Sequence, residues 1–269
     1  MNSRITTSDY EQLSGQSAEL VRNAIRNGRY SGHTAGLAQG YLQCNLVILT
    51  ADAASDFEHF CSRNSKACPL VSVSSAGQTG FNDLGAQIDL RTDLPLYNIY
   101  RSGKLHAQKQ DVSDLWQEDF VAFAIGCSFT FERALIDAGI SMRHVDLDLT
   151  VPMFKTNVPT LSAGVFGGQT VMSMRPVKQD RIQQVFDICS LYPHAHGEPM
   201  HIGSPEAIGI TDLNSPDWGN GVPVYEDEIP VFWGCGVTSQ AAVLNAAPEL
   251  CITHAPGAML ITDSNELPA

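Results

Sequence analysis

Two segments of the chain share a pattern that suggests chemistry: "AIGCSFTFERAL" at 124–135 and "FWGCGVTSQAAV" at 232–243. In each, an apolar run ends in Gly-Cys, a threonine follows three residues after the cysteine, and small residues continue at helical spacing. The matching positions are Gly126, Cys127, Thr130 and Ala134 in the first segment, and Gly234, Cys235, Thr238 and Ala242 in the second. Either the fold repeats one packing solution, or both turns contribute to one site.

The chemistry of such turns is anion binding. A glycine after a buried strand permits a tight turn into a helix, whose first N–H groups have no acceptor within the helix. We therefore expect a small anion to contact the residues around the two cysteines, namely Gly126, Ser128, Thr130, Gly236 and Thr238. The helix dipole also favours a thiolate, which makes Cys127 and Cys235 candidate nucleophiles or acid–base groups. The alternative is that both thiols only fill a tight corner, because cysteine is among the most buried residue types.

Histidines form a second group of candidates. The segment "HAHGEPMHIG" contains His194, His196, Glu198 and His201. A proline and a glycine between them interrupt any helix, so the spacing does not match HExxH and we predict no metal site. Because histidine titrates near neutral pH, we expect His201 to act as an acid or base and His196 to contact the substrate. His254, at the end of the apolar run in "ITHAPG", is another acid–base candidate, with a structural hydrogen bond as the alternative.

Arginine suits the bidentate binding of a carboxylate. Arg91 in "DLRTDLP" and Arg175 in "SMRPV" are the candidate clamps, with a surface or ion-pair role as the alternative for each. Glu132 lies in the first turn of the helix after Cys127, as a catalytic carboxylate or as a complement to the helix dipole.

Strands that alternate with helices must position these groups. Helices are expected at 17–28, 50–64, 129–139 and after Gly236. Strands are expected at 43–49, 69–75, 120–126 and 230–236, in two segments after 250, and in a hairpin that turns at Ser102-Gly103. This alternation predicts an α/β fold with a mostly parallel sheet flanked by helices. Both Gly-Cys turns would then lie at the carboxyl edge of the sheet, where ligands bind in such folds.

The pattern changes between about 140 and 196, where antiparallel-looking strands precede one amphipathic helix. We predict a main α/β domain formed by 1–139 and 197–269, and a smaller inserted α+β domain at 140–196. Asn157 and Arg175 lie in the predicted insert, from which we expect them to reach the substrate.

Composition excludes several classes of partner. The net charge of −13 and the lack of any basic run argue against nucleic-acid binding. The longest apolar runs are too short to span a bilayer, and the polar start lacks the layout of a signal peptide. No CxxC pair occurs among the seven cysteines, which fits reduced thiols in a cytoplasmic protein. The oligomeric state stays open, with a homo-oligomer among the possibilities.

Several blocks of the chain resemble the hydro-lyase family that includes the D-glutamate cyclase domain. They are "HTAGLAQGY", "CNLVIL", "LRTDLP", "FAIGCSFTFE", "VPMFKTNVP", "MRPV", "HGEPMHIGSPEAIGI", "VPVFWGCGVTSQAAV" and "ITHAPGAMLITD", in the family's order over about 20–263. His33 and Gln39 replace the proline usual in the first block, which bears on the rigidity of that turn.

The resemblance implies a two-domain α/β protein and a carbon–oxygen lyase. We expect no cofactor. For the D-glutamate cyclase relatives, the reaction closes D-glutamate to 5-oxo-D-proline with loss of water. This reaction needs a base, an acid, donors for the oxyanion and a clamp for the carboxylate. His254 or His201, the N–H groups of the turns, and Arg175 or Arg91 would fill these roles.

Other reactions stay open. A cysteine thioester is the covalent variant of the same ring closure, and a dehydratase of a hydroxy acid is a close alternative. A thiol-dependent amidase or acyl transferase that uses Cys127, or a non-catalytic binder of a small carboxylate, would belong to other classes.

Overall fold

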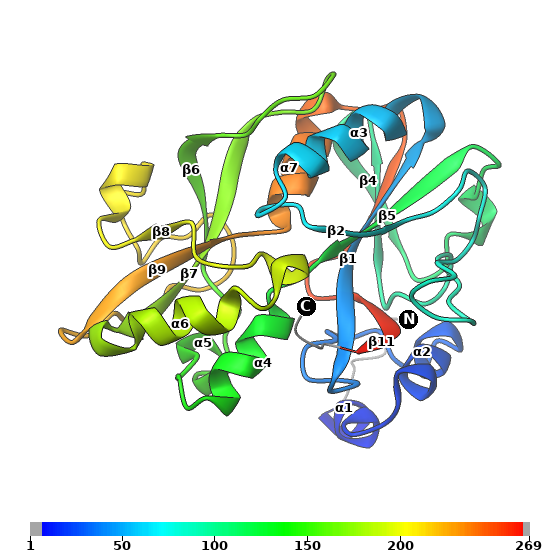
Figure 1. Ribbon diagram of the computed structural model, residues 1–269. Helices are drawn as coiled ribbons and strands as arrows, with labels where there is room; N and C mark the ends of the chain where they lie inside the picture. Colours follow the sequence, from blue (N-terminus) through cyan, green and yellow to red (C-terminus); the bar gives the residue numbers. More distant parts are fainter. Residues whose placement is uncertain (1–6, 266–269) are drawn as a thin grey trace. The chain divides into compact units, whose positions relative to one another are not determined.

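The computed structural model describes residues 7–265, which form two compact units. The first unit contains 7–55, 70–125 and 246–265, and the second contains 56–69 and 126–245. The predicted insert at 140–196 therefore lies inside a larger second unit, which also holds both Gly-Cys turns (Figure 1). None of the helices in these residues is long and apolar enough to cross a membrane.

The first unit is built on sheet A, with strand order β2-β5-β1-β10-β3-β4 and β11 also paired with β1. Its strands are β1 (Tyr41–Thr50), β2 (Leu70–Val73), β3 (Tyr97–Arg101), β4 (Lys104–Lys109), β5 (Phe120–Gly126), β10 (Cys251–His254) and β11 (Leu260–Asn265). β1 runs antiparallel to β10 and β11, β10 to β3, β3 to β4, and β2 to β5. The hairpin predicted at Ser102-Gly103 is confirmed as β3 and β4.

The prediction of a mostly parallel sheet flanked by helices is wrong, because these pairings are antiparallel. The apolar run of β5 is buried along nearly its whole length, as expected. Such a run indicates that both faces of the strand are covered. It does not indicate whether the neighbouring strands are parallel or antiparallel, because that depends on how the chain returns to the sheet.

Helices α1 (Thr7–Leu13), α2 (Ala18–Arg26) and the first residues of α3 (Ala51–Arg63) also belong to this unit. The predicted helix at 17–28 is confirmed as α2. The Ser17 side chain caps it by accepting from the Leu20 N–H at 3.4 Å. Val21, Ala24 and Ile25 are its buried face and cluster with Ile261 of β11, and Figure 1 shows α2 beside that strand.

The second unit is built on sheet B, with strand order β6-β7-β9-β8 and antiparallel pairing throughout that order. Its strands are β6 (Met153–Pro159), β7 (Gln169–Lys178), β8 (His201–Ile202) and β9 (Glu228–Gly234). Its helices are the rest of α3, then α4 (Phe129–Asp137), α5 (Arg143–Asp146), α6 (Ile182–Cys189) and α7 (Val237–Ala246), with single 3-10 turns at Gln179–Arg181, Pro193–Ala195 and Pro205–Ile208.

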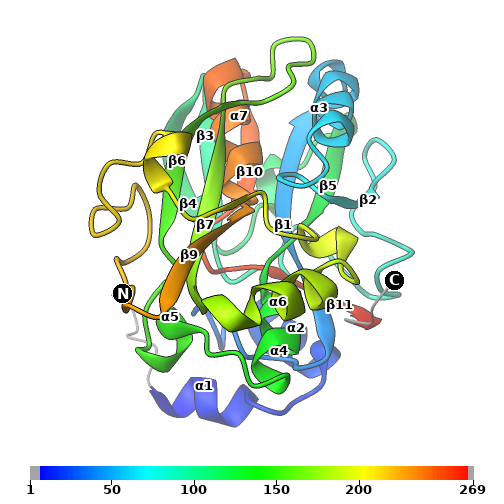
Figure 2. The same ribbon diagram turned by 60° about the vertical axis from the view of Figure 1, so that its left-hand side comes forward.

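The two faces of sheet B carry different side chains, because neighbouring residues of a strand point to opposite faces. On one face, Val177 of β7 and Trp233 of β9 pack with residues of α4 and α6, the helices that lie beside these strands in Figure 2. On the other face, Met174 and Phe232 pack with residues of β6 and of the segment near 208–210. Arg175 has the same parity as Val177, so it points toward α4.

Candidate functional site

The two Gly-Cys turns have the same order of elements. β5 ends at Gly126 and α4 begins at Phe129, while β9 ends at Gly234 and α7 begins at Val237. In each turn the first N–H of the helix, that of Phe129 or of Val237, lowers the pKa of the preceding cysteine and so opposes the effect of burial. The N-cap of α4 is Ser128, whose side chain forms no capping hydrogen bond.

Each glycine is required by a backbone segment that runs directly against it. A Cβ at Gly126 would lie 1.6 Å from the carbonyl oxygen of His194, and a Cβ at Gly234 would lie 2.5 Å from the carbonyl oxygen of Lys66. The Gly126 N–H also donates to the Pro69 carbonyl at 2.9 Å. The segments 66–69 and 194–196 therefore hold both turns in place, and only glycine admits them.

A buried ion pair joins β7 to α4 behind the first turn. Arg175 is fully buried, and its Nε donates to Oε1 of Glu132 at 2.9 Å. A second bond from Nη2 reaches the same oxygen, and others reach Oγ of Ser173 at 2.7 Å and Oγ of Ser128 at 3.0 Å. The guanidinium also lies 5.0 Å from the ring centre of Phe131 on α4. Arg175 is thus held on nearly all sides by protein groups.

Glu132 is the counter-charge of this arginine. Burial alone would raise the pKa of Glu132, but the charge of Arg175 and a hydrogen bond from His144 lower it to about 2. His144 Nε2 lies 3.3 Å from Oε1. Glu132 is consequently ionised at neutral pH, and the pair has no net charge to offer a substrate.

Cys235 is part of the electrostatic environment of Cys127. Desolvation raises the pKa of Cys127 to about 12, opposed by the N–H of Phe129 and reinforced by Glu132 and Cys235. Burial likewise raises the pKa of Cys235. Both side chains are partly exposed, yet both are thiols at neutral pH, contrary to the thiolates that the helix dipole led us to expect.

The N–H groups that follow the two cysteines are unused. Among residues 7–265, neither the N–H of Ser128 nor that of Gly236 forms a hydrogen bond. Gly236 and Ser128 are both buried. Buried N–H groups without an acceptor are rare in folded proteins, so these two are the strongest indication of a ligand-binding function in the second unit.

His196 lies next to these turns and is almost completely buried, with 2% of its surface exposed. Its Nδ1 lies 2.8 Å from the same Lys66 carbonyl that packs against Gly234. Because a carbonyl oxygen only accepts, Nδ1 carries the proton and Nε2 has the lone pair. Burial lowers the pKa of His196 to about 4, so the ring is neutral at physiological pH.

The remaining predicted residues of the second unit have other surroundings. Thr238 bonds to both the N–H and the carbonyl of Val171 through its hydroxyl, which ties α7 to β7. Thr130 is buried in the first turn of α4. His201 pairs with Phe232 across β8 and β9 and so lies on the face of sheet B opposite Arg175.

Asn157 is an exposed residue of β6, packed beside Gly209. No group of three His, Cys, Asp or Glu side chains in the described part of the chain is arranged to hold a metal. In the predicted histidine cluster, Glu198 pairs instead with Lys66, at 3.0 Å.

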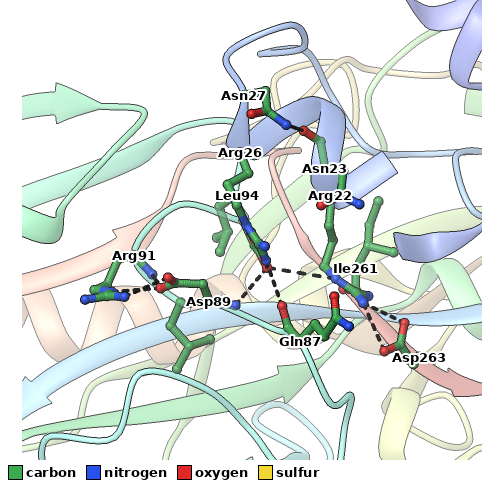
Figure 3. Close-up of polar contacts among 12 residues, drawn as sticks. Arg22, Asn23, Arg26, Asn27, Gln87, Asp89, Arg91, Leu94, Ile261 and Asp263 are labelled. Carbon is green, nitrogen blue, oxygen red and sulfur yellow. Dashed lines mark hydrogen bonds and ion pairs between the residues drawn. The ribbon is translucent and has the colours of Figure 1, made fainter. Parts of the chain in front are cut away.

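Two predicted residues belong to the first unit. Arg91 forms a bidentate pair with Asp89 at 2.8 Å for each bond, as Figure 3 shows beside the Arg22 and Arg26 contacts. His254 on β10 accepts from the Leu46 N–H at 3.2 Å, and burial lowers its pKa to about 4. Both side chains have structural partners, which are the alternatives raised for them from the sequence.

Three contributors to the site carry no signal in the sequence: Ser173, His144 and the carbonyl of Lys66. Ser173 lies two residues before Arg175 on the same face of β7, a spacing that the sequence displays but that gains meaning only once the strand is known. His144 lies outside the helix of its partner Glu132, and Lys66 is 130 residues from His196, so no local pattern reveals either contact.

Comparison with known proteins places the chain in a family. The family model described as D-glutamate cyclase matches residues 121–263. The chain belongs to the D-glutamate cyclase family. The matched region of this family member begins in β5 and includes both Gly-Cys turns, Arg175 and His196.

Close relatives span nearly the whole chain. It is 52% identical to a protein of Dinoroseobacter shibae over 96% of this chain and 86% of the relative. It is 51% identical to one of Cupriavidus taiwanensis, over 90% and 91%, and 53% identical to one of Verminephrobacter eiseniae, over 90% and 89%. All three carry the name "Putative hydro-lyase". A nitrogen repressor-like protein of Methanococcus jannaschii aligns at 10% identity over 87% of this chain and 91% of that chain, with a TM-score of only 0.38.

Proposed function

We propose that this D-glutamate cyclase family member is a carbon–oxygen lyase that removes water from a small carboxylate, and that D-glutamate, closed to 5-oxo-D-proline, is its substrate. The observation that carries the proposal is that two buried residues, Ser128 and Gly236, have N–H groups that form no hydrogen bond within residues 7–265, in a chain of this family. Both follow a thiol that is neutral at physiological pH.

These donors suit the charge that develops in the reaction. When the α-nitrogen attacks the γ-carboxyl carbon, negative charge builds up on the carboxyl oxygens. Preorganised N–H groups at the start of a helix stabilise this charge without a reorganisation cost. With N–H groups as the donors, the site needs no unpaired cation to bind the carboxylate. This agrees with the pairing of Arg175 with Glu132.

The pKa values of the two thiols favour this proposal over thiol chemistry. A thioester route, or an amidase that uses Cys127, needs a thiolate nucleophile. The raised pKa values of Cys127 and Cys235 keep both sulfurs protonated. We therefore propose a non-covalent ring closure in which the turns bind the carboxylate and the thiols line the site.

Incubation of the purified protein with D-glutamate tests this function. Mass spectrometry should show a product lighter by one water that co-elutes with 5-oxo-D-proline. L-Glutamate and small hydroxy acids, run in parallel, distinguish a cyclase from a dehydratase of hydroxy acids. If no acid loses water while D-glutamate binds in a calorimetric titration, the protein is a binder and the lyase proposal is wrong.

A further inference from the structure

His196 has an unusual backbone for a side-chain-bearing residue. It follows the 3-10 turn Pro193–Ala195 with φ of 76°, in the left-handed region that few residues other than glycine adopt, histidine being enriched there with asparagine and aspartate. The Gly197 N–H closes the turn by donating to the Tyr192 carbonyl at 3.0 Å. Strained conformations of this kind persist where the surrounding structure fixes them, and they are concentrated at functional sites.

Lys66 contacts the residues on both sides of Gly197, namely His196 and Glu198. Its carbonyl accepts from Nδ1 of His196, and its ammonium group lies 3.0 Å from Glu198. The same carbonyl packs against Gly234, so the imidazole lies beside the Gly234-Cys235 turn. The carbonyl of His194, two residues earlier, packs against Gly126, so the same segment also runs beside the first turn.

The ring has one nitrogen without a partner. Within residues 7–265, no hydrogen bond is made by Nε2, although the side chain is 2% exposed. Since Nδ1 carries the proton, Nε2 presents a lone pair. A neutral imidazole with a free lone pair, held by the carbonyl that packs against the Gly234-Cys235 turn, is the kind of group that proton transfer to a reacting group requires.

We propose that Nε2 of His196 is the proton-transferring group of this site and that the Lys66 carbonyl is its positioning group, an inference that rests on the proposed function. In ring closure, the α-nitrogen lone pair forms the bond to the γ-carboxyl carbon and one C–O bond breaks, with its electron pair left on oxygen. The two protons lost from the substrate ammonium leave with that oxygen as water. His196 accepts a proton from nitrogen, delivers it to the departing oxygen, and returns to its starting tautomer.

The test compares His196→Ala with His59→Ala, which removes an exposed histidine of α3 in the same unit. His196→Ala should lower kcat by about 10²- to 10⁴-fold with KM changed little, the usual contribution of a general acid–base group. Added imidazole should restore part of the lost rate, which a purely structural role would not allow. His59→Ala should retain wild-type kcat. Wild-type turnover by His196→Ala would overturn the role of His196 and leave the proposed function intact.

A second measurement does not depend on turnover. In ¹⁵N-histidine-labelled protein, His196 should show an unprotonated Nε2 whose chemical shift changes when D-glutamate is added. A protonated Nε2, or an Nε2 shift that D-glutamate leaves unchanged, would overturn the inference even if the wild-type protein removes water from no acid.

Discussion

Removal of the Glu132 charge is predicted to destabilise the protein strongly. A pKa lowered from 4.5 to about 2 corresponds to roughly 3 kcal/mol of stability at neutral pH, at about 1.4 kcal/mol per pKa unit. Glu132→Gln keeps the size of the side chain but leaves Arg175 buried without a counter-charge, which typically costs about 3–5 kcal/mol. Both arguments give a loss of the same order.

The pH dependence has a definite sign. The carboxylate is favoured in the folded state, so its contribution is complete above pH 4.5 and is lost as the pH falls toward about 2. Urea unfolding of wild-type protein and Glu132→Gln at several pH values should give a difference that is constant near neutrality and shrinks over this acid range.

Two further variants make the experiment decisive. Asp137→Asn, which breaks the exposed Arg133–Asp137 pair on the same helix, should cost no more than about 0.5 kcal/mol. Combining Glu132→Gln with Arg175→Met should recover much of the stability, because loss of both buried charges avoids an unpaired one. A cost below about 1 kcal/mol for Glu132→Gln at pH 7 would refute the reasoning.

Three other predictions follow from the same geometry. Gly234→Ala forces a Cβ to within 2.5 Å of a carbonyl oxygen and should cost about 1–3 kcal/mol in thermal unfolding; an unchanged Tm would show that the contact is not close. Cys127→Ser and Cys235→Ser should each keep turnover within about tenfold of wild type, and both thiols should be alkylated by iodoacetamide more slowly at pH 8 than free cysteine; loss of turnover with D-glutamate binding intact would favour a thioester. The buried rings of His196 and His254 should titrate near pH 4 in NMR, and stability should fall from pH 6.5 toward 4 because the unfolded state binds these protons first; titration of both near 6.5 would contradict their burial.

The local structure around the turns is readable from the sequence. An apolar run that ends in glycine, followed by helical spacing of small residues, predicts each strand, turn and helix in the order observed. These features depend on neighbours along the chain. Strand direction does not, and the parallel sheet predicted for 120–126 and its neighbours is wrong because β2 and β5 pair antiparallel.

In the site, too, the local features could be predicted from the sequence and the contacts between distant residues could not. Arg91 has a partner two residues away, yet its pairing with Asp89 is decided by the loop that both occupy. Glu132 was interpreted from its helix position, whereas its ion pair with Arg175 joins residues 43 positions apart. His196 lies in a segment that the sequence marks as unusual, but its tautomer depends on a carbonyl 130 residues away. Contacts of this range arise from packing and leave no local pattern.

The central claim is that the two Gly-Cys turns of the second unit form one carboxylate site. Backbone amide NMR of the wild-type protein during titration with D-glutamate tests it most directly. The amide signals of Ser128 and Gly236 should shift together and give a single Kd. If they shift with different Kd values, or stay unchanged while signals elsewhere in the chain respond, the two turns do not form that site.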